Sequence, residues 1–272
     1  MSQRLHGSTA IVTGGGRGIG AATARAFARE GAAVGLIART ADEVEAVADD
    51  VRRSGGRAVA AVADVRDLDA VRSAVQHVES EIGPADVLIC NAGISGGPPQ
   101  PAWEADPAEW WRTQEVNVLG VLHAVHVVVP GMVQRGRGRV IHVGSLVGVR
   151  SEPGSSAYGC SKASMLRLAE VLAADLNGTG VVSIAMSPGL VLTRMTEPMK
   201  RHGIWPDDAW SDIGRAEGLM VRLAAGDGDA LAGTLVHAED DLDALVARAE
   251  EIHARGWNAL RMIRGHESLE PV

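Results

Sequence analysis

Seven short runs rich in valine, alanine and isoleucine recur along this chain, and stretches with helical periodicity lie between them. The runs occupy residues 9–13, 32–38, 58–63, 86–90, 139–144, 181–186 and 233–238. Strands that are apolar on both faces and alternate with helices form parallel sheets that are covered on both sides. The sequence therefore predicts a doubly wound α/β fold with a seven-stranded parallel sheet and helices on both faces.

Residues that favour helix starts stand where this pattern needs them. Thr40 followed by Glu43 predicts a capping box, and Asp106 followed by Glu109 predicts another, with Pro107 in the first helical position. These signals predict helices that begin near residues 41 and 107.

The bulk properties limit the classes of protein that fit. No linker divides the pattern, so residues 1–272 are expected to form a single domain. The net charge of −8 argues against nucleic-acid binding or an anionic membrane surface. No run reaches the ~18 apolar residues of a membrane span, and the N-terminus lacks the apolar core of a signal peptide. Cys90 and Cys160 predict no disulfide framework and fit a cytoplasmic protein.

The first strand runs into the glycine-rich segment TGGGRGIG, residues 13–20, which opens a helical stretch. A glycine-rich turn between a strand and a helix N-terminus brings backbone N–H groups close to a pyrophosphate. Such a loop alone is weak evidence, but this one stands in the strand–turn–helix context that supports the motif. The sequence therefore predicts a nucleotide-binding domain of the Rossmann type.

Further motifs follow the glycine-rich segment in a fixed order. They are Asn-Ala-Gly at 91–93, Asn117, Ser145, Tyr-x-x-x-Lys at 158–162 and PGLVLT at 188–193. This ordered set resembles the short-chain dehydrogenase/reductase family over about residues 5–195. The chain departs from the family pattern at Cys90, where a second asparagine is common, and in lacking the usual Asp-Gly-Gly after the last strand.

Tyr158 is the only tyrosine of the chain, and Lys162, one of two lysines, shares its helix face. A phenol with a pKa near ~10 is a poor acid–base catalyst at neutral pH, and a nearby ammonium is expected to lower that pKa. Tyr158 would then exchange a proton with a carbonyl oxygen while hydride reaches the carbon. The resemblance implies that Lys162 also bonds the nicotinamide ribose, Ser145 bonds the substrate oxygen and Asn117 holds a relay water.

The resemblance also implies which residues contact the dinucleotide. They are Gly14, Gly16, Arg17, Gly18, Ile19, Gly20, Arg39, Asp64, Val65, Asn91, Ala92, Gly93, Tyr158, Lys162, Pro188, Gly189, Val191 and Thr193. Asp64 would bond the adenine amino group. The second strand ends in Ala38, where an acid would bond the ribose of NAD, and Arg39 follows it. Arg39 and Arg17 without a carboxylate suit a 2′-phosphate, so NADP(H) is favoured, with NAD(H) as the alternative.

The segment after the sixth strand, residues 191–226, is expected to form the substrate lid. Large apolar side chains gather there and in the loop after Asn91: Met195, Met199, Trp205, Trp210 and Trp103. They favour a bulky apolar ketone or alcohol as the substrate. Three basic residues of the lid leave an acidic substrate as the alternative: Arg194, Lys200 and Arg201.

Residues 239–272 depart from the family pattern and are expected to form an atypical C-terminal helix and tail. In the family, the long helices that carry Asn117 and Tyr158 pair with their copies. The resemblance therefore implies a homodimer or homotetramer, whose usual contacts at the C-terminal end are in doubt here.

Other kinds of site fit the sequence less well. His123 and His126 have no cysteine or carboxylate partners at metal-ligand spacing, so no metal is expected. His142 precedes Ser145, but no G-x-S-x-G elbow supports a hydrolase. The prediction is a ketoreductase that moves hydride between NADP(H) and a carbonyl or secondary alcohol. An NAD-dependent alcohol dehydrogenase working oxidatively and a non-catalytic nucleotide-binding protein are the alternatives.

Overall fold

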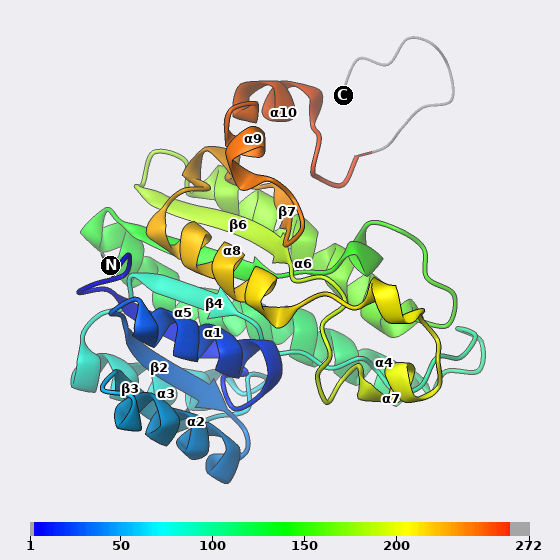
Figure 1. The fold of residues 1–272 in the computed structure, drawn as a ribbon, viewed down its shortest axis with the longest axis horizontal. Helices are drawn as coiled ribbons and strands as arrows, with labels where there is room; N and C mark the ends of the chain where they lie inside the picture. The colour runs from blue at the N-terminus through cyan, green and yellow to red at the C-terminus, as the bar shows by residue number, and fades with distance from the viewer. Residues whose placement is uncertain (1–2, 262–272) are drawn as a thin grey trace.

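The computed structural model describes residues 3–261 and contains, within that range, one sheet of seven parallel strands (Figure 1). The strands are β1 Thr9–Thr13, β2 Ala33–Ala38, β3 Arg57–Val62, β4 Val87–Cys90, β5 Gly138–Val143, β6 Val181–Ser187 and β7 Leu235–His237. Every neighbouring pair is parallel. The predicted doubly wound α/β fold is confirmed, and each expected apolar run overlaps one strand.

Helices cover both faces of the sheet (Figure 1). They are α1 Gly18–Arg29, α2 Ala41–Arg53, α3 Leu68–Ile82, α4 Pro107–Gln114, α5 Gly120–Arg135, α6 Ser156–Asp175, α7 Glu197–Arg201, α8 Ile213–Ala225, α9 Leu242–Val246 and α10 Ala249–Arg255. Shorter turns are η1 Glu115–Leu119, η2 Leu146–Gly148, η3 Asp207–Ala209 and η4 Asp229–Leu231. α1, α2 and α8 pack on one face, and α3, α5 and α6 pack on the other.

The strand order β3-β2-β1-β4-β5-β6-β7 places the functional segments. The chain winds outward from β1 through β2 and β3, then returns to start again at β4 on the other side of β1. In such sheets, ligands bind beyond the carboxyl ends of the strands at this reversal. The segments that leave β1, β4, β5 and β6 carry most of the predicted site residues, and Arg39, Asp64 and Val65 follow β2 and β3, so the topology brings them all to one edge of the sheet.

α4, η1 and α5 form one continuous helical segment, Pro107–Arg135, with a mean hydropathy of 1.8 in its most apolar window. By length and composition alone this segment could cross a membrane. Half of that window is buried inside the protein, where Val121, Ala124 and Val128 pack in the same apolar cluster as α3 and the sheet. Packing in the core therefore accounts for the buried half of this window.

The predicted lid region, residues 191–226, divides into two parts. α8 packs beside α1, with Leu219, Met220 and Leu223 buried in the core, so this part is a core helix and not a lid. The preceding residues, 192–212, include only the short helices α7 and η3, neither of which buries a residue. This exposed part keeps the character expected of a lid.

The segment after β7 covers the outer edge of the sheet. The Leu235 N–H donates to the Asn258 carbonyl at 2.7 Å, and the Asn258 amide donates to the Leu235 carbonyl at 3.0 Å. The His237 N–H donates to the Asp240 carboxylate at 2.8 Å, and the Asp240 N–H donates to the His237 carbonyl at 3.0 Å. The outward backbone groups of β7 are thus satisfied within the chain. Part of the predicted C-terminal tail, residues 262–272, lies outside the described residues.

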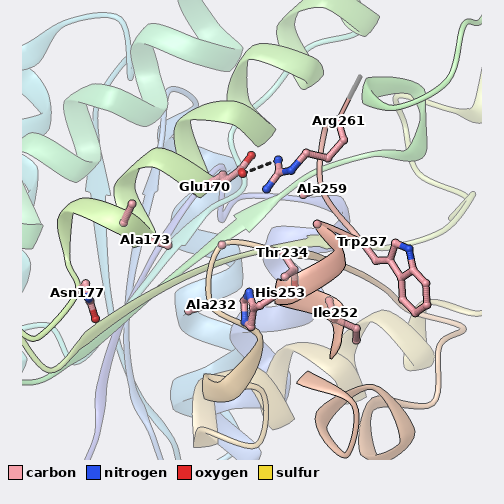
Figure 2. A pocket seen from close by; sticks show the side chains of 13 residues that line it. Glu170, Ala173, Asn177, Ala232, Thr234, Ile252, His253, Trp257, Ala259 and Arg261 are labelled. Carbon is pink, nitrogen blue, oxygen red and sulfur yellow. Dashed lines mark ion pairs between the residues drawn. The ribbon is translucent and has the colours of Figure 1, made fainter. Parts of the chain in front are cut away.

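Side chains of α6, α10 and the segments beside them line a hollow (Figure 2). Its volume is about 320 Å³. Glu170 of α6 pairs with Arg261 across it at 2.6 Å, which joins the C-terminal segment to this helix. Glu170 lies 12 residues after Tyr158, roughly 18 Å along the helix at 1.5 Å per residue. The hollow therefore lies apart from the predicted catalytic residues.

Candidate active site

The glycine-rich segment between β1 and α1 forms a loop with no room for side chains. Gly14 has a φ of +66°, and a Cβ there would lie 2.8 Å from the Ala92 Cα. A Cβ at Gly20 would lie 2.4 Å from the Gly14 carbonyl oxygen. No side chain caps α1, whose N-cap is Arg17, so the first backbone N–H groups of this helix are left for an anion. The loop fits the pyrophosphate of a dinucleotide.

Asn91 supports this loop from the end of β4. Its Nδ2 donates to the carbonyl oxygens of Thr13 at 2.9 Å and Gly14 at 3.1 Å. The Thr13 hydroxyl accepts the N–H groups of Asn91 at 3.1 Å and Ala92 at 3.2 Å. The amide hydrogens of the Asn91 side chain are therefore committed to the loop. Asn91 shapes the predicted cofactor site by holding the loop in place.

Arg39, Asp64 and Val65 lie beyond the ends of β2 and β3, where the adenosine was expected. The Asp64 carboxylate accepts from Arg66 at 2.8 Å and lies 3.9 Å from the Arg39 guanidinium. The Arg66 guanidinium holds the pKa of Asp64 below its usual value, so this carboxylate stays charged. Val65 is buried, and its carbonyl oxygen lies 2.9 Å from Nδ1 of His123. The loop after β3 is thereby fixed to α5.

The expectation that no carboxylate stands near Arg17 is wrong. The Glu43 carboxylate lies 3.3 Å from the Arg17 guanidinium and 3.1 Å from that of Arg194. Thr40 is the N-cap of α2, as predicted, but no side chain closes the predicted capping box. Glu43 turns to the two guanidiniums instead, because hydrogen bonds between charged groups are stronger than those to a neutral backbone N–H.

Ser145, Tyr158 and Lys162 meet beyond the carboxyl end of β5. Ser145 is the N-cap of η2, and its Oγ accepts the Val147 N–H at 3.2 Å. Tyr158 and Lys162 lie in the first two turns of α6, and Lys162 Nζ is 5.5 Å from the centroid of the Tyr158 ring. Lys162 is buried, and its ammonium donates to the Val143 carbonyl at 2.7 Å. α6 and β5 thus bring the three predicted catalytic side chains together.

The expected net lowering of the Tyr158 pKa is wrong for this structure, because the effect of burial outweighs that of the Lys162 charge. Burial raises the pKa of the Tyr158 phenol to about 12, and a hydrogen bond with Ser145 opposes that shift. Burial also lowers the pKa of Lys162 to about 8. The ammonium bonds the Val143 carbonyl and is not directed at the phenol oxygen. The Tyr158 ring keeps partial exposure to solvent, which limits the rise, but the phenol is protonated at neutral pH.

Asn117 is buried in η1, the π-helical turn between α4 and α5. Its Nδ2 donates to the Ile94 carbonyl and to the Ser161 hydroxyl, each at 2.9 Å, and its Oδ1 accepts the Ile94 N–H at 2.8 Å. Ser161 in turn donates to the Tyr158 carbonyl at 2.7 Å. Because both amide hydrogens are used, the side chain has no donor left for the expected relay water. Asn117 ties the loop after β4 to the turn that carries Tyr158.

The segment after β6 faces the glycine loop. Gly189 has a φ of +81°, and a Cβ there would lie 2.4 Å from the Ser211 hydroxyl, so only glycine fits this turn. Pro188 and Val191 are buried on either side of it. A Cβ at Gly18 would lie 3.4 Å from the methyl group of Thr193. The predicted cofactor residues of this segment therefore stand opposite the loop.

A sequence model described as short chain dehydrogenase matches residues 8–203. The chain belongs to the short-chain dehydrogenase/reductase family. It is 40% identical over 195 residues to a short chain dehydrogenase of Pseudocercospora fijiensis, covering 72% of this chain and 63% of that protein. The chain thus spans less than two thirds of that relative. It is 35% identical over 229 residues to gluconate 5-dehydrogenase of Gluconobacter oxydans, covering 81% of this chain and 89% of that protein.

Solved structures of the family have the same fold. Gluconate 5-dehydrogenase from Burkholderia cenocepacia, in complex with NADP and tartrate, superposes with a TM-score of 0.82 at 27% identity. The match covers 89% of this chain and 98% of that one. Short-chain dehydrogenases/reductases are oxidoreductases that bind NAD(P), which agrees with the glycine loop and with the Ser145, Tyr158 and Lys162 group.

His142 is a buried residue of this short-chain dehydrogenase/reductase that no sequence motif marks as part of the site. Its Nε2 lies 3.1 Å from Ser183 Oγ, which donates to the Ala169 carbonyl of α6 at 2.9 Å. Because the Ser183 proton is used there, His142 Nε2 carries its own proton. Burial, with a smaller effect of the Lys162 charge, lowers the pKa of His142 to about 4, so the imidazole is neutral. His142 bonds Ser183 and not Ser145, which removes the basis for a hydrolase.

The sequence also raised the questions of a reactive cysteine and of a metal site. Burial raises the pKa of the Cys90 thiol to about 12, so this cysteine, which stands at the family's asparagine position, is an unreactive core residue. Across residues 3–261, no three His, Cys, Asp or Glu side chains are grouped to hold a metal ion.

Proposed function

We propose that this short-chain dehydrogenase/reductase is an NADPH-dependent ketoreductase. The observation that carries the proposal is the position of Ser145, Tyr158 and Lys162 at the edge of the sheet that also holds the glycine loop. The loop offers an anion site for a dinucleotide, and the three side chains offer a proton donor with two charge-stabilising neighbours. This intact group argues against the alternative of a non-catalytic nucleotide-binding protein.

The chemistry follows from the protonation states of these groups. When bound, the nicotinamide cofactor would supply hydride to the substrate carbon. Tyr158, protonated because its pKa is about 12, donates its phenol proton to the carbonyl oxygen. The Ser145 hydroxyl stabilises the negative charge that develops on that oxygen. Lys162, charged below its pKa of about 8, stabilises the phenolate that is left.

The Tyr158 phenol can serve both directions of the reaction. It gives its proton to the carbonyl oxygen in reduction, and the phenolate takes a proton back in oxidation. An oxidative alcohol dehydrogenase that uses the same residues is therefore kept as the alternative.

Two guanidiniums support NADP(H) as the cofactor. The side chains of Arg17 and Arg39 are 53% and 44% exposed, so both can reach an added phosphate. Ala38 at the end of β2 leaves no acid to bond the ribose hydroxyls. The similar gluconate 5-dehydrogenase from Burkholderia cenocepacia was solved with NADP.

Arg39→Asp tests this choice of cofactor. The change removes a charge-assisted contact to the 2′-phosphate and adds repulsion, so we expect kcat/KM with NADPH to fall about 10- to 100-fold, and the value with NADH to hold or rise. Steady-state rates with both cofactors measure it. Arg57→Asp makes the same change in net charge and serves as the control. Arg57 is the first residue of β3, at the edge of the sheet away from the carboxyl ends of the strands. Equal or better use of NADH by the wild-type chain would contradict the NADP(H) assignment.

Exposed apolar side chains at the proposed lid support a bulky apolar substrate. Leu192, Met195 and Ile204 are 50%, 38% and 48% exposed. The basic residues of the lid already have partners in this structure. Arg194 pairs with Glu43 and Arg201 with Glu197, while Lys200 lies 5.2 Å from the Trp210 ring centroid and 3.9 Å from Asp207. An acidic substrate is therefore the weaker proposal.

Trp205→Ala tests the size of the substrate. If Trp205 contacts the substrate, its removal takes away apolar contact area that only large ketones use, so we expect KM to rise about 10-fold or more for aryl or polycyclic ketones and less than about 2-fold for small ones. Trp257→Ala, in the C-terminal segment beside Arg248 and Arg255, is the matched control. Equal increases for both sizes of ketone would exclude Trp205 from the substrate site.

A second candidate function comes from the names of relatives. Similar proteins include gluconate 5-dehydrogenase of Gluconobacter oxydans and galactitol 2-dehydrogenase of Cereibacter sphaeroides, which is 39% identical over 216 residues. A polyol or sugar-acid dehydrogenase that works oxidatively with NAD is therefore the alternative. Oxidation of such polyols with NAD faster than reduction of apolar ketones with NADPH would favour it.

We also propose a cytoplasmic homo-oligomer that pairs through the face of α4, α5 and α6. Large apolar side chains are exposed there: Trp111, Leu119, Leu122, Val133 and Val171. Such exposed apolar residues favour an interface between copies. The outer edge of β7 is occupied by Asn258 and Asp240, so strand pairing between copies at this edge is not part of the proposal.

A further inference from the structure

Glu43 connects three segments that are distant in the sequence. It lies in the first turn of α2, and its carboxylate contacts Arg17 of the glycine loop and Arg194 of the proposed lid. The contacts to Glu43 Oε1 are 3.3 Å from Arg17 and 3.1 Å from Arg194, so both guanidiniums share one oxygen atom. Neither the cofactor proposal nor the catalytic group accounts for an acid in this place.

Backbone packing holds Glu43 beside the loop. A Cβ at Gly16 would lie 3.2 Å from the Glu43 Cβ and 3.3 Å from the Val44 N, so the glycine loop rests on this turn of α2. The Glu43 side chain is 31% exposed, against 53% for Arg17 and 76% for Arg194. The carboxylate is therefore the least exposed charge of the three, and both arginines contact it.

We propose that Glu43 is a resident counter-ion that sets how strongly the chain binds the 2′-phosphate of the cofactor, with Arg194 as the residue that moderates it. The proposal rests on NADP(H) as the cofactor. Arg17 has one guanidinium, which Glu43 and a 2′-phosphate compete for. Glu43 also repels a phosphate dianion directly, because both groups are negative. Arg194 weakens both effects, because it draws the same Glu43 oxygen toward the lid.

The other two acidic side chains near this part of the site, Asp64 and Asp42, do not pair with Arg17. Asp64 is paired chiefly with Arg66, and only weakly with Arg39 at 3.9 Å. Asp42, the neighbour of Glu43 in the same helical turn, is exposed, and no ion pair to it is formed among residues 3–261. Glu43 is thus the acid whose charge is directed at Arg17, and Asp42 offers a matched control.

The test is calorimetric titration of the full chain with 2′,5′-ADP and with 5′-AMP, which differ by the 2′-phosphate. Exposed ion pairs contribute only modestly, so we expect Glu43→Gln to tighten 2′,5′-ADP about 3- to 6-fold and to leave 5′-AMP within about 2-fold. Arg194→Gln should weaken 2′,5′-ADP about 2- to 4-fold, because it frees Glu43 to pair with Arg17. In the Glu43→Gln background, Arg194→Gln should have almost no effect.

Three outcomes would overturn the role of Glu43. They are an unchanged or weaker affinity of Glu43→Gln for 2′,5′-ADP, an equal gain for 5′-AMP, and an equal gain from Asp42→Asn, which removes the same charge from the same turn. The wild-type chain tests the cofactor separately. If it binds 5′-AMP as tightly as 2′,5′-ADP, NADP(H) is the wrong cofactor. A selective gain in Glu43→Gln would still show that Glu43 opposes the phosphate.

Discussion

Tyr158→Phe is expected to lower kcat for ketone reduction by about 10²- to 10⁴-fold, the contribution of a positioned general acid. The phenylalanine keeps the ring and removes only the hydroxyl that donates the proton. Steady-state kinetics with NADPH and an apolar ketone measure the loss. Affinity for NADPH, followed by titration, should change less than about 3-fold, because the hydroxyl serves the substrate oxygen.

Cys160→Ser is the matched control for this variant. Cys160 lies two residues after Tyr158 on α6, but it is exposed and contributes nothing to the proposed proton transfer. It should therefore keep its kcat. If Tyr158→Phe retained most of the wild-type turnover, the phenol would not be the proton donor, and the role given to Ser145 would lose its basis as well.

Lys162→Met is expected to lower kcat/KM by about 10²-fold or more and, at the same time, to stabilise the fold. A lysine pKa of about 8 in the folded chain, against 10.5 ordinarily, means that burial of the charge is costly. Removing the charge should raise the free energy of unfolding at pH 7 by about 1–3 kcal/mol, less the contact with the Val143 carbonyl. Chemical denaturation and turnover measure the two effects.

The pH dependence identifies the cause of that stabilisation. Between pH 8 and 10.5 the folded Lys162 has lost its proton while the unfolded chain still binds one, so wild-type stability rises with pH in this window. The advantage of Lys162→Met should therefore shrink from pH 8 to 10.5. Lys200→Met, at the exposed second lysine, should show no such trend. A constant difference between Lys162→Met and wild type at every pH would mean that Lys162 is not buried as a charge.

The strands could be predicted because the sheet is parallel and covered on both faces. Such strands leave continuous apolar runs, and these runs overlap all seven strands found within residues 3–261. β7 is shorter than its run, three residues in place of 233–238. Gly233 has a φ of +78° and leaves the extended conformation, and Asn258 then takes the outer edge of the strand. A contact with a residue so late in the chain is absent from any local pattern.

The proximity of the proposed catalytic side chains was predictable from the sequence, but their physical state was less so. The four-residue spacing of Tyr158 and Lys162 shows that they share a helix face, but their pKa values depend on burial by the rest of the fold. The motif around Thr40 and Glu43 favours a capping box, yet a partner 151 residues away, Arg194, decides where the Glu43 carboxylate goes. Burial and distant ion pairs are tertiary properties, which short motifs do not specify.

The most direct test of the proposed reaction follows the transferred hydrogen itself. The wild-type chain is incubated with NADPH that carries deuterium in place of both hydrogens at the reactive carbon of its nicotinamide ring and with an excess of an apolar ketone, and the product is examined by mass spectrometry. The proposal predicts an alcohol with one deuterium on its carbinol carbon, formed by wild type and reduced at least about 100-fold in Tyr158→Phe. Binding of NADPH without deuterium transfer to any ketone of the panel would contradict the ketoreductase proposal.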